Sequence, residues 1–146
     1  MAQTTGVMNG TLMRLYLDQA AGSTYTVMGN SMDVTFNSSH SPRETTNQTS
    51  GGNASFLEGK RSYTVDFNNL QAEDGAHNFW IQFATFISSS ARAKVTGKLT
   101  TGVSGDYYVT FVGYLTALNV STGGPEGNVT MNGSIQVTGL PVSTTN

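Results

Sequence analysis

The feature that most constrains this chain is an alternation of apolar and polar residues that recurs along most of its length. In the segment MDVTF, Met32, Val34 and Phe36 alternate with Asp33 and Thr35. Successive side chains of a β-strand point to opposite faces, so a period of two predicts a strand with one buried face and one polar face. The pattern therefore predicts a mainly β fold.

The same period recurs in SYTVDF, ARAKVTGKL, NVTMNGSIQVTG and, near the start, TLMRLYLDQ. DYYVTFVGYL carries apolar side chains on both faces, which is typical of a strand covered on both sides. The clusters TGVSGD and STGGPEGN separate neighbouring strands and predict hairpins. The spacing predicts a β-sandwich of about seven strands, in a single domain over residues 1–146.

One segment, EDGAHNFWIQFATFISSS, breaks the period of two. Its bulky residues recur at the spacing of an amphipathic helix, and they are Phe79, Trp80, Phe83, Phe86 and Ile87. A strand also fits part of the segment, but its length and the number of periodic matches favour a helix. We expect this one α-helix to flank the sandwich and to cover unpaired hydrogen-bonding groups at its edge or end.

Composition narrows the function classes. Charged residues make up 11% of the chain, cysteine is absent, and the net charge is −2. The two histidines, His40 and His77, fall in no metal-binding or catalytic motif, and no phosphate-binding or dinucleotide-binding fingerprint occurs. The sequence therefore predicts no enzyme activity, no cofactor, no metal site and no specific nucleic-acid binding. Nor does it predict a membrane helix or a secretory signal. A surface of uncharged polar residues favours contact between copies of the chain.

Between two of the predicted strands lies a long polar stretch, SSHSPRETTNQTSGGNASFLEGK. A loop longer than about 12–15 residues is uncommon in a compact domain and is usually functional or disordered. We therefore expect residues 38–59 to form a long polar assembly loop, mobile in the free subunit and ordered by neighbouring subunits.

Three stretches, in this order, resemble the major tail tube protein of long-tailed bacteriophages. They are MDVTF before the long loop, FLEGKRSYTVDF at its return, and the closing hairpin GYLTALNVSTGGPEGNVTMNGSIQVTGLP. The resemblance covers roughly residues 30–141. It implies a structural virion protein, a β-sandwich with a flanking helix, whose copies close into a ring, expected to be hexameric. The rings stack into a tube that serves as a conduit for genome delivery.

The resemblance also implies partners and a location. Besides copies of itself, the chain would contact other tail proteins, such as the tape measure and the tail terminator. DNA would pass through the tube without specific binding, and no membrane would take part. The protein would be assembled in the cytoplasm of the bacterial host and would reside in the virion tail.

Two groups of residues are candidates for these contacts. The first group lies in or beside the loop and is expected to contact other subunits: Arg43, Glu44, Phe56, Leu57, Glu58, Lys60 and Arg61. The second is a face of small polar residues suited to the lumen of a tube that must not bind phosphate: Asn128, Thr130, Asn132, Ser134 and Gln136. The basic face of Arg92, Lys94 and Lys98 is expected outside the tube or paired with acids.

Other readings stay open. A β-sandwich with exposed aromatic residues could be an adhesion or carbohydrate-binding module, and Tyr107, Tyr108 and Tyr114 are candidates for such a surface. A decoration or tail-terminator protein, which forms a single ring or cap, is a second alternative. A tube component of a secretion system is a third.

Overall fold

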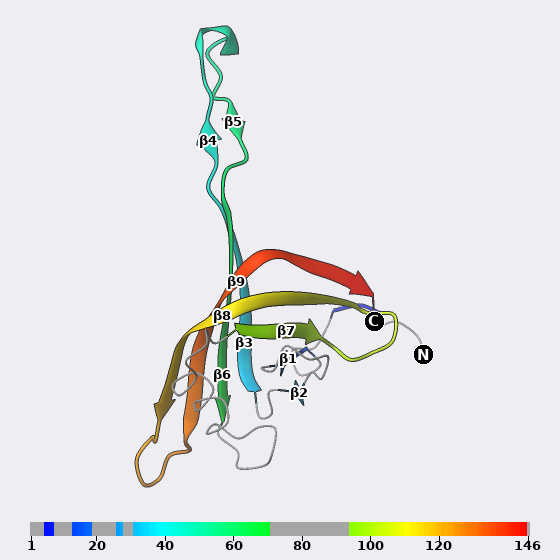
Figure 1. Cartoon of the computed structure of the whole chain (residues 1–146), viewed down its shortest axis with the longest axis vertical. Coiled ribbons are helices and arrows are strands. Elements are labelled where there is room, and N and C mark those ends of the chain that lie inside the picture. The colour runs from blue at the N-terminus through cyan, green and yellow to red at the C-terminus, as the bar shows by residue number, and fades with distance from the viewer. Residues whose placement is uncertain (1–4, 8–12, 19–25, 28–30, 71–93, 146) are drawn as a thin grey trace.

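The computed structural model describes residues 5–7, 13–18, 26–27, 31–70 and 94–145 (Figure 1). Nine strands and one short 3₁₀ helix lie in these ranges. In chain order they are β1 (Arg14–Asp18), β2 (Thr26–Val27), β3 (Ser31–His40), β4 (Arg43–Glu44), η1 (Gln48–Ser50), β5 (Phe56–Leu57), β6 (Arg61–Leu70), β7 (Lys94–Thr100), β8 (Tyr107–Ser121) and β9 (Thr130–Thr145).

Seven of the strands form one antiparallel sheet in the order β2-β1-β7-β8-β9-β6-β3, and β4 and β5 form a second, small sheet. The prediction of a mainly β fold is confirmed, and the described residues contain nine strands where about seven were predicted. The two predicted hairpins are confirmed as well, because β7 pairs with β8 and β8 pairs with β9. The two layers expected of a sandwich are, in the described part of the chain, one continuous sheet.

Two long strands, β8 with 15 residues and β9 with 16, make the sheet continuous. They pair with each other, and β8 also pairs with β7 while β9 also pairs with β6. The register between β8 and β9 shifts at Thr110/Val112 and again at Leu115/Ala117. Gly139, with φ of 77°, lies in the first of these irregularities, at the bend where β9 turns away from β6 toward the C-terminus (Figure 1). Bulges of this kind bend a strand and increase its twist. As a result β3 and β6 run along the long axis of the molecule, whereas β1 and β7 run across it (Figure 1).

The curled sheet encloses an apolar core. Its buried residues come from β1, β6, β7, β8 and β9, and they are Leu15, Leu17, Val65, Phe67, Val95, Phe111, Leu118, Met131, Ile135 and Val137. Phe36 of β3 packs against this cluster, with its ring centroid 6.2 Å from that of Phe111 on β8. Burial of apolar side chains at about 25 cal/mol per Å² is the main favourable term for such a fold.

The alternation predicted these buried positions except Leu118, and it also assigned two exposed residues to the buried side. Val129 is 38% exposed, because it belongs to the turn before β9 and not to the strand. Tyr107 is 67% exposed, because it begins β8 at the margin of the sheet.

The predicted helix, including Phe79 and Trp80, lies outside the described residues. None of the helical residues described in the structure forms a segment able to cross a membrane.

Candidate assembly surfaces

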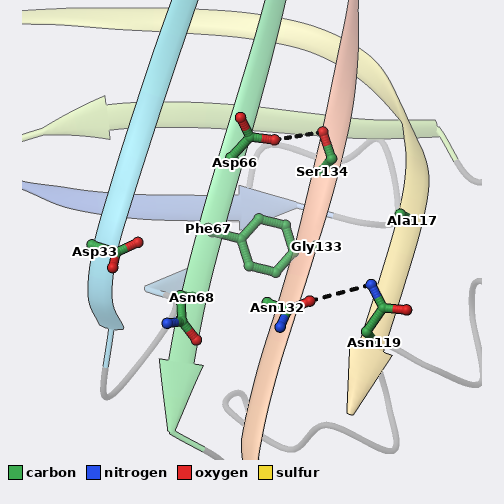
Figure 2. Close-up of a pocket in the computed structure, with 9 residues that line it drawn as sticks. All are labelled: Asp33, Asp66, Phe67, Asn68, Ala117, Asn119, Asn132, Gly133 and Ser134. Carbon is green, nitrogen blue, oxygen red and sulfur yellow. Dashed lines mark hydrogen bonds between the residues drawn. The ribbon is translucent and has the colours of Figure 1, made fainter. Parts of the chain in front are cut away.

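A polar face runs across four neighbouring strands on the side of the sheet opposite the core (Figure 2). The β-ladder places four of its residues in one row, namely Asp33 on β3, Asn68 on β6, Asn132 on β9 and Asn119 on β8. In such a row the side chains lie on the same face of the sheet. The predicted lumen residue Asn132 therefore belongs to a wider surface.

Hydrogen bonds hold the side chains of this face in place. Ser134 Oγ donates to Asp66 Oδ1 at 2.7 Å, and Asn37 Nδ2 donates to Asp66 Oδ2 at 2.8 Å. Asn119 Nδ2 donates to Asn132 Oδ1 at 3.2 Å (Figure 2). These hydrogen bonds fix the orientation of the Asp66 carboxylate, so the side chains of this face are ordered.

The lining of the shallow hollow at the centre of this face contains carboxylates and amides but no lysine or arginine: Asp33, Asp66, Phe67, Asn68, Ala117, Asn119, Asn132, Gly133 and Ser134. Within the described residues, no group of three or more histidine, cysteine or acidic side chains is arranged to hold a metal ion. The surface has the chemistry of a neutral to acidic wall.

The predicted lumen residues are placed unevenly. Thr130, Asn132, Ser134 and Gln136 share one face of β9, whereas Asn128 lies in the turn before the strand. Sequence reasoning missed the contribution of β3, β6 and β8 to this face. The polar positions of the alternating segments carried part of that signal, but strand order was needed to bring them together.

The polar face is bounded by open strand edges on both sides. Within the described part of the chain, β3 pairs with β6 alone, and Ala117 to Ser121 of β8 pair with β9 alone. An open edge presents unpaired N–H and C=O groups that another chain can pair with. The face is therefore open to continuation by further strands at either side.

The basic residues of β7 lie on the same side of the sheet as the polar face, beyond β8. Lys94 is opposite Tyr114 of β8, which is itself opposite Gln136 of β9, and Lys98 is opposite Thr110. Lys98 Nζ lies 4.0 Å from the centroid of the Tyr108 ring, a cation–π contact. The third predicted basic residue, Arg92, lies outside the described residues.

The segment predicted as a polar loop, residues 38–59, is instead a long hairpin that projects from the sheet (Figure 1). The pairing of β3 with β6 continues as far as His40 and Arg61. Ser41 N then donates to Lys60 O at 2.9 Å, and β4 pairs with β5. Periodicity could not reveal these strands, because a hairpin exposed on both faces has no apolar face to alternate with a polar one. This hairpin, residues 41–60, is called the arm below.

The tip of the arm is closed by its own side chains. Asn47 Oδ1 accepts hydrogen bonds from Thr49 N at 2.9 Å and from Thr49 Oγ1 at 2.5 Å. Ser50 Oγ in turn accepts from Asn47 N at 3.1 Å, which completes a capping box on η1. Below the tip, Thr45 N donates to Ser55 O at 2.7 Å. The arm thus has a defined shape without help from a second chain.

Gly59 makes the base of the arm narrow. A β-carbon at this position would overlap the carbonyl oxygen of Ser41 on the opposite strand. Only glycine allows the two strands to approach this closely. The glycine of the FLEGK segment therefore has a steric role at the junction of arm and sheet.

The structure also places the predicted contact residues of the arm. Phe56 and Leu57 on β5 are 58% and 54% exposed, and they pair across the hairpin with Glu44 and Arg43. Two large apolar side chains held out in solvent are typical of a surface that meets a partner.

The charged residues at the base form a cluster within one chain. Arg61 Nε donates to Glu58 Oε1, and His40 Nδ1 lies 3.8 Å from the same oxygen. The hydrogen bond from Arg61, with help from its charge and that of His40, holds the pKa of the Glu58 carboxyl below its usual value. The bond to Glu58 raises the pKa of Arg61. Glu58 and Arg61, predicted to pair with other subunits, are thus partners of each other.

A notch lies beside this cluster, where β9 turns away from β6. The β6–β9 ladder ends at Thr64 and Gln136, and the side chain of Gln136 donates from Nε2 to Tyr63 O at 3.0 Å. The notch has a volume of about 570 Å³ and is lined by Lys60, Arg61, Ser62, Tyr63, Gln136, Val137, Thr138, Gly139 and Leu140. Sequence reasoning did not identify this surface, because its two walls are more than seventy residues apart in the chain.

Comparison with known proteins rests on structure. No protein-family model matches the sequence, and no curated protein matches it. A chain from the tail of an empty gene transfer agent particle, refined with C6 symmetry, superposes with a TM-score of 0.73 at 14% identity, over 94% of this chain and 99% of that one. A chain of the SPP1 tail tube gives a TM-score of 0.67 at 17% identity, over 96% of this chain and 80% of that one.

Contractile injection systems contain similar chains. One from the sheath-tube complex of the PVC system, in the extended state, superposes with a TM-score of 0.61 at 10% identity. It matches over 92% of this chain and 88% of its own length. Identities this low establish the fold alone. The protein therefore has the fold found in chains of phage-like tails and injection systems, along nearly its whole length.

Proposed function

We propose that this chain is a structural virion protein whose copies form rings that stack into a tail tube, a conduit for genome delivery. The observation that carries the proposal is the polar face of β3, β6, β9 and β8, which is free of lysine and arginine at its centre and has open strand edges on both sides. The fold shared with tail chains supports it. A structural role, and not an enzymatic one, follows.

The polar face is the proposed wall of the bore. Asp33, Asp66 and the amides around them repel phosphate or leave it unbound, so a DNA chain can slide past. The predicted lumen residues Asn132, Ser134 and Gln136 belong to this wall, with Thr130 beside them. Lys94 and Lys98 of β7 lie on the same side of the sheet, beyond β8, so the proposed wall of the bore ends at β8.

Ring closure uses the open edges. The edge of β3 in one copy and the free end of β8 in the next carry the same polar face, so their pairing continues the wall from subunit to subunit. Closure also removes edges that would otherwise promote aggregation. The C6 symmetry of the similar gene transfer agent tail supports a ring of six.

The arm joins one ring to the next. It projects along the long axis of the subunit, and stacking of rings is a head-to-tail contact that propagates as an open filament (Figure 1). Phe56 and Leu57 are the proposed apolar anchors, with Arg43 and Glu44 beside them. Because the hairpin is preformed, less of the binding energy is offset by ordering of the arm than for a disordered loop.

Other tail proteins, such as a tape measure inside the tube and a terminator at its end, are the expected further partners. Assembly would take place in the cytoplasm of a bacterial host, and the finished protein would reside in the tail. No cofactor is required for this role. The helix predicted around Phe79 to Ile87 remains part of the proposed subunit.

Electron microscopy of concentrated protein, beside sedimentation across a concentration series, tests the proposal. We expect rings and tubes, with a sharp onset of polymer above a critical concentration. Protein that stays monomeric at every concentration, including after addition of preformed seeds, would contradict it. A glycan screen on the same sample examines the rival role as a carbohydrate-binding module, for which Tyr107, Tyr108 and Tyr114 remain candidates.

Thiol labelling tests the assignment of the bore, because the chain has no cysteine of its own. In assembled tubes, Asn132→Cys should react with a small maleimide but not with one carrying a polymer too large to enter the bore. In disassembled subunits the same variant should react with both reagents. Equal labelling of tubes and of disassembled subunits by the large reagent would remove Asn132 from the bore.

A further inference from the structure

We propose that the notch at the base of the arm receives the β8–β9 turn of the next copy along the tube, with Glu126 of the turn pairing with Lys60 of the notch. This inference rests on the proposed tube. It names the two surfaces that meet at the ring-to-ring contact beside the arm, one at each end of the subunit.

The β8–β9 turn is compact and exposes the carboxylate of Glu126. Gly127 N donates to Gly124 O at 3.2 Å, which closes a β-turn with Pro125 and Glu126 at its two central positions. Proline is favoured at the first of these positions because its φ is already set. Glu126 is exposed, and it is the only charged residue between Thr122 and Val129.

The notch offers the opposite charge. In the described part of the chain Arg61 is paired with Glu58, whereas Lys60 has no ion-pair partner. Lys60 is exposed at the rim, and Leu140, which is 70% exposed, supplies an apolar wall. The Glu126 carboxylate fits the ammonium group of Lys60, and the Pro125 ring fits the wall made by Leu140.

The two surfaces lie at opposite ends of the molecule. Arg61 begins β6 at the arm, and Leu70 ends it opposite Thr130, the first residue after the turn. Figure 1 shows the turn between β8 and β9 at the end of the long axis away from the arm. Translation of a second copy along this axis brings its turn toward the notch. Such a contact repeats without limit, as a tube requires.

Charge reversal tests the pairing. Glu126→Lys and Lys60→Glu should each raise the critical concentration for polymer by about tenfold or more, because like charges would then face each other. The double variant should return to within about threefold of wild type. Arg14→Glu, a reversal on β1 and away from both surfaces, serves as the matched control. Because all three side chains are exposed, the unfolding midpoint of the monomer should be unchanged in every variant.

Engineered cysteines identify the occupant of the notch. With Lys60→Cys and Glu126→Cys in one chain, mild oxidation of tubes should give a ladder of disulfide-linked chains on a non-reducing gel. A ladder from Lys60→Cys with Leu57→Cys, and none with Glu126→Cys, would place the arm in the notch and overturn the inference. Single reversals that polymerise like wild type would overturn it as well. Failure of the wild-type chain to polymerise would instead count against the tube itself.

Discussion

The ring of Phe67 on β6 lies against Gly133 on β9, so close that a β-carbon at residue 133 would stand 2.6 Å from Phe67 Cζ (Figure 2). The same β-carbon would lie 2.7 Å from the carbonyl oxygen of Ala117 on β8. Glycine within a strand is unfavourable unless another group packs over it. Here the Phe67 ring fills that space and joins the core to the strands that carry the polar face.

Gly133→Ala should therefore destabilise the subunit. The added methyl group meets backbone on one side and a packed ring on the other, and overpacking of this kind costs about 1–3 kcal/mol. Urea unfolding of the monomer, followed by near-ultraviolet circular dichroism, measures the change. Thr138→Ala, at an exposed position of the same strand, should stay within about 0.5 kcal/mol of wild type. If Gly133→Ala changed the free energy of unfolding as little as Thr138→Ala, then β9 could move away from Phe67 and Ala117 without loss of stability, and the prediction would be wrong.

Gly59→Ala should prevent assembly into tubes without lowering the stability of the folded subunit. The methyl group would overlap the carbonyl of Ser41 and force apart the base of the arm, whereas the buried core is far along β3 and β6 from this point. We expect an unfolding midpoint close to wild type and loss of tubes in sedimentation and electron microscopy. Ala54→Ser, in the arm but away from the base, is the control and should polymerise normally. Normal tubes from Gly59→Ala would mean that the arm base tolerates the added methyl group.

Limited proteolysis should cut the free subunit first between Ser38 and Gly59, because this hairpin is exposed on all sides and has no buried residue at its tip. Assembly should suppress the cuts, since the arm then lies against another ring. Equal cleavage of monomer and tube at matched protein concentration would argue against the arm as a stacking contact.

Truncation of the two apolar anchors gives a second test of the arm. Phe56→Ala and Leu57→Ala should weaken polymerisation by about tenfold or more each, as for anchors at the centre of an interface. Both side chains are more than half exposed in the monomer, so its stability should change by less than about 0.5 kcal/mol. Asn53→Ala, an exposed polar change nearer the tip, is the comparison. The anchors would lose their assigned role if all three variants polymerised alike.

Acid should loosen the base of the arm. The pKa of the Glu58 carboxyl is lowered, chiefly by the hydrogen bond from Arg61, so the contact stabilises the folded arm above the ordinary carboxyl range. That stabilisation is lost as the pH falls through the lowered pKa of Glu58, because the protonated carboxyl no longer attracts Arg61. Proteolysis of the monomer arm by an acid-active protease, measured from neutral pH downward, should rise in this window. Glu58→Gln should abolish that dependence, and an unchanged profile in this variant would assign the effect to other groups.

Much of the fold was accessible to local reasoning. The alternation in MDVTF and SYTVDF predicted β3 and β6, and it assigned Val34, Phe36, Val65 and Phe67 to the core side. It failed where no face is buried, as in the arm, and at the ends of strands, as at Val129. The candidate surfaces were predicted less completely: the apolar pair Phe56 and Leu57 was found, but the notch and the β3 and β6 parts of the polar face were not.

The sequence by itself determined the β character and the hairpins, because these depend on neighbours along the chain and on the two-residue period of a strand. Only the tertiary structure decided the strand order. That order sets Asp33, Asn68, Asn132 and Asn119 in one row and brings Lys60 beside Leu140. The physical reason is that pairing between distant strands is set by how the whole core packs. No local pattern encodes which strands become neighbours.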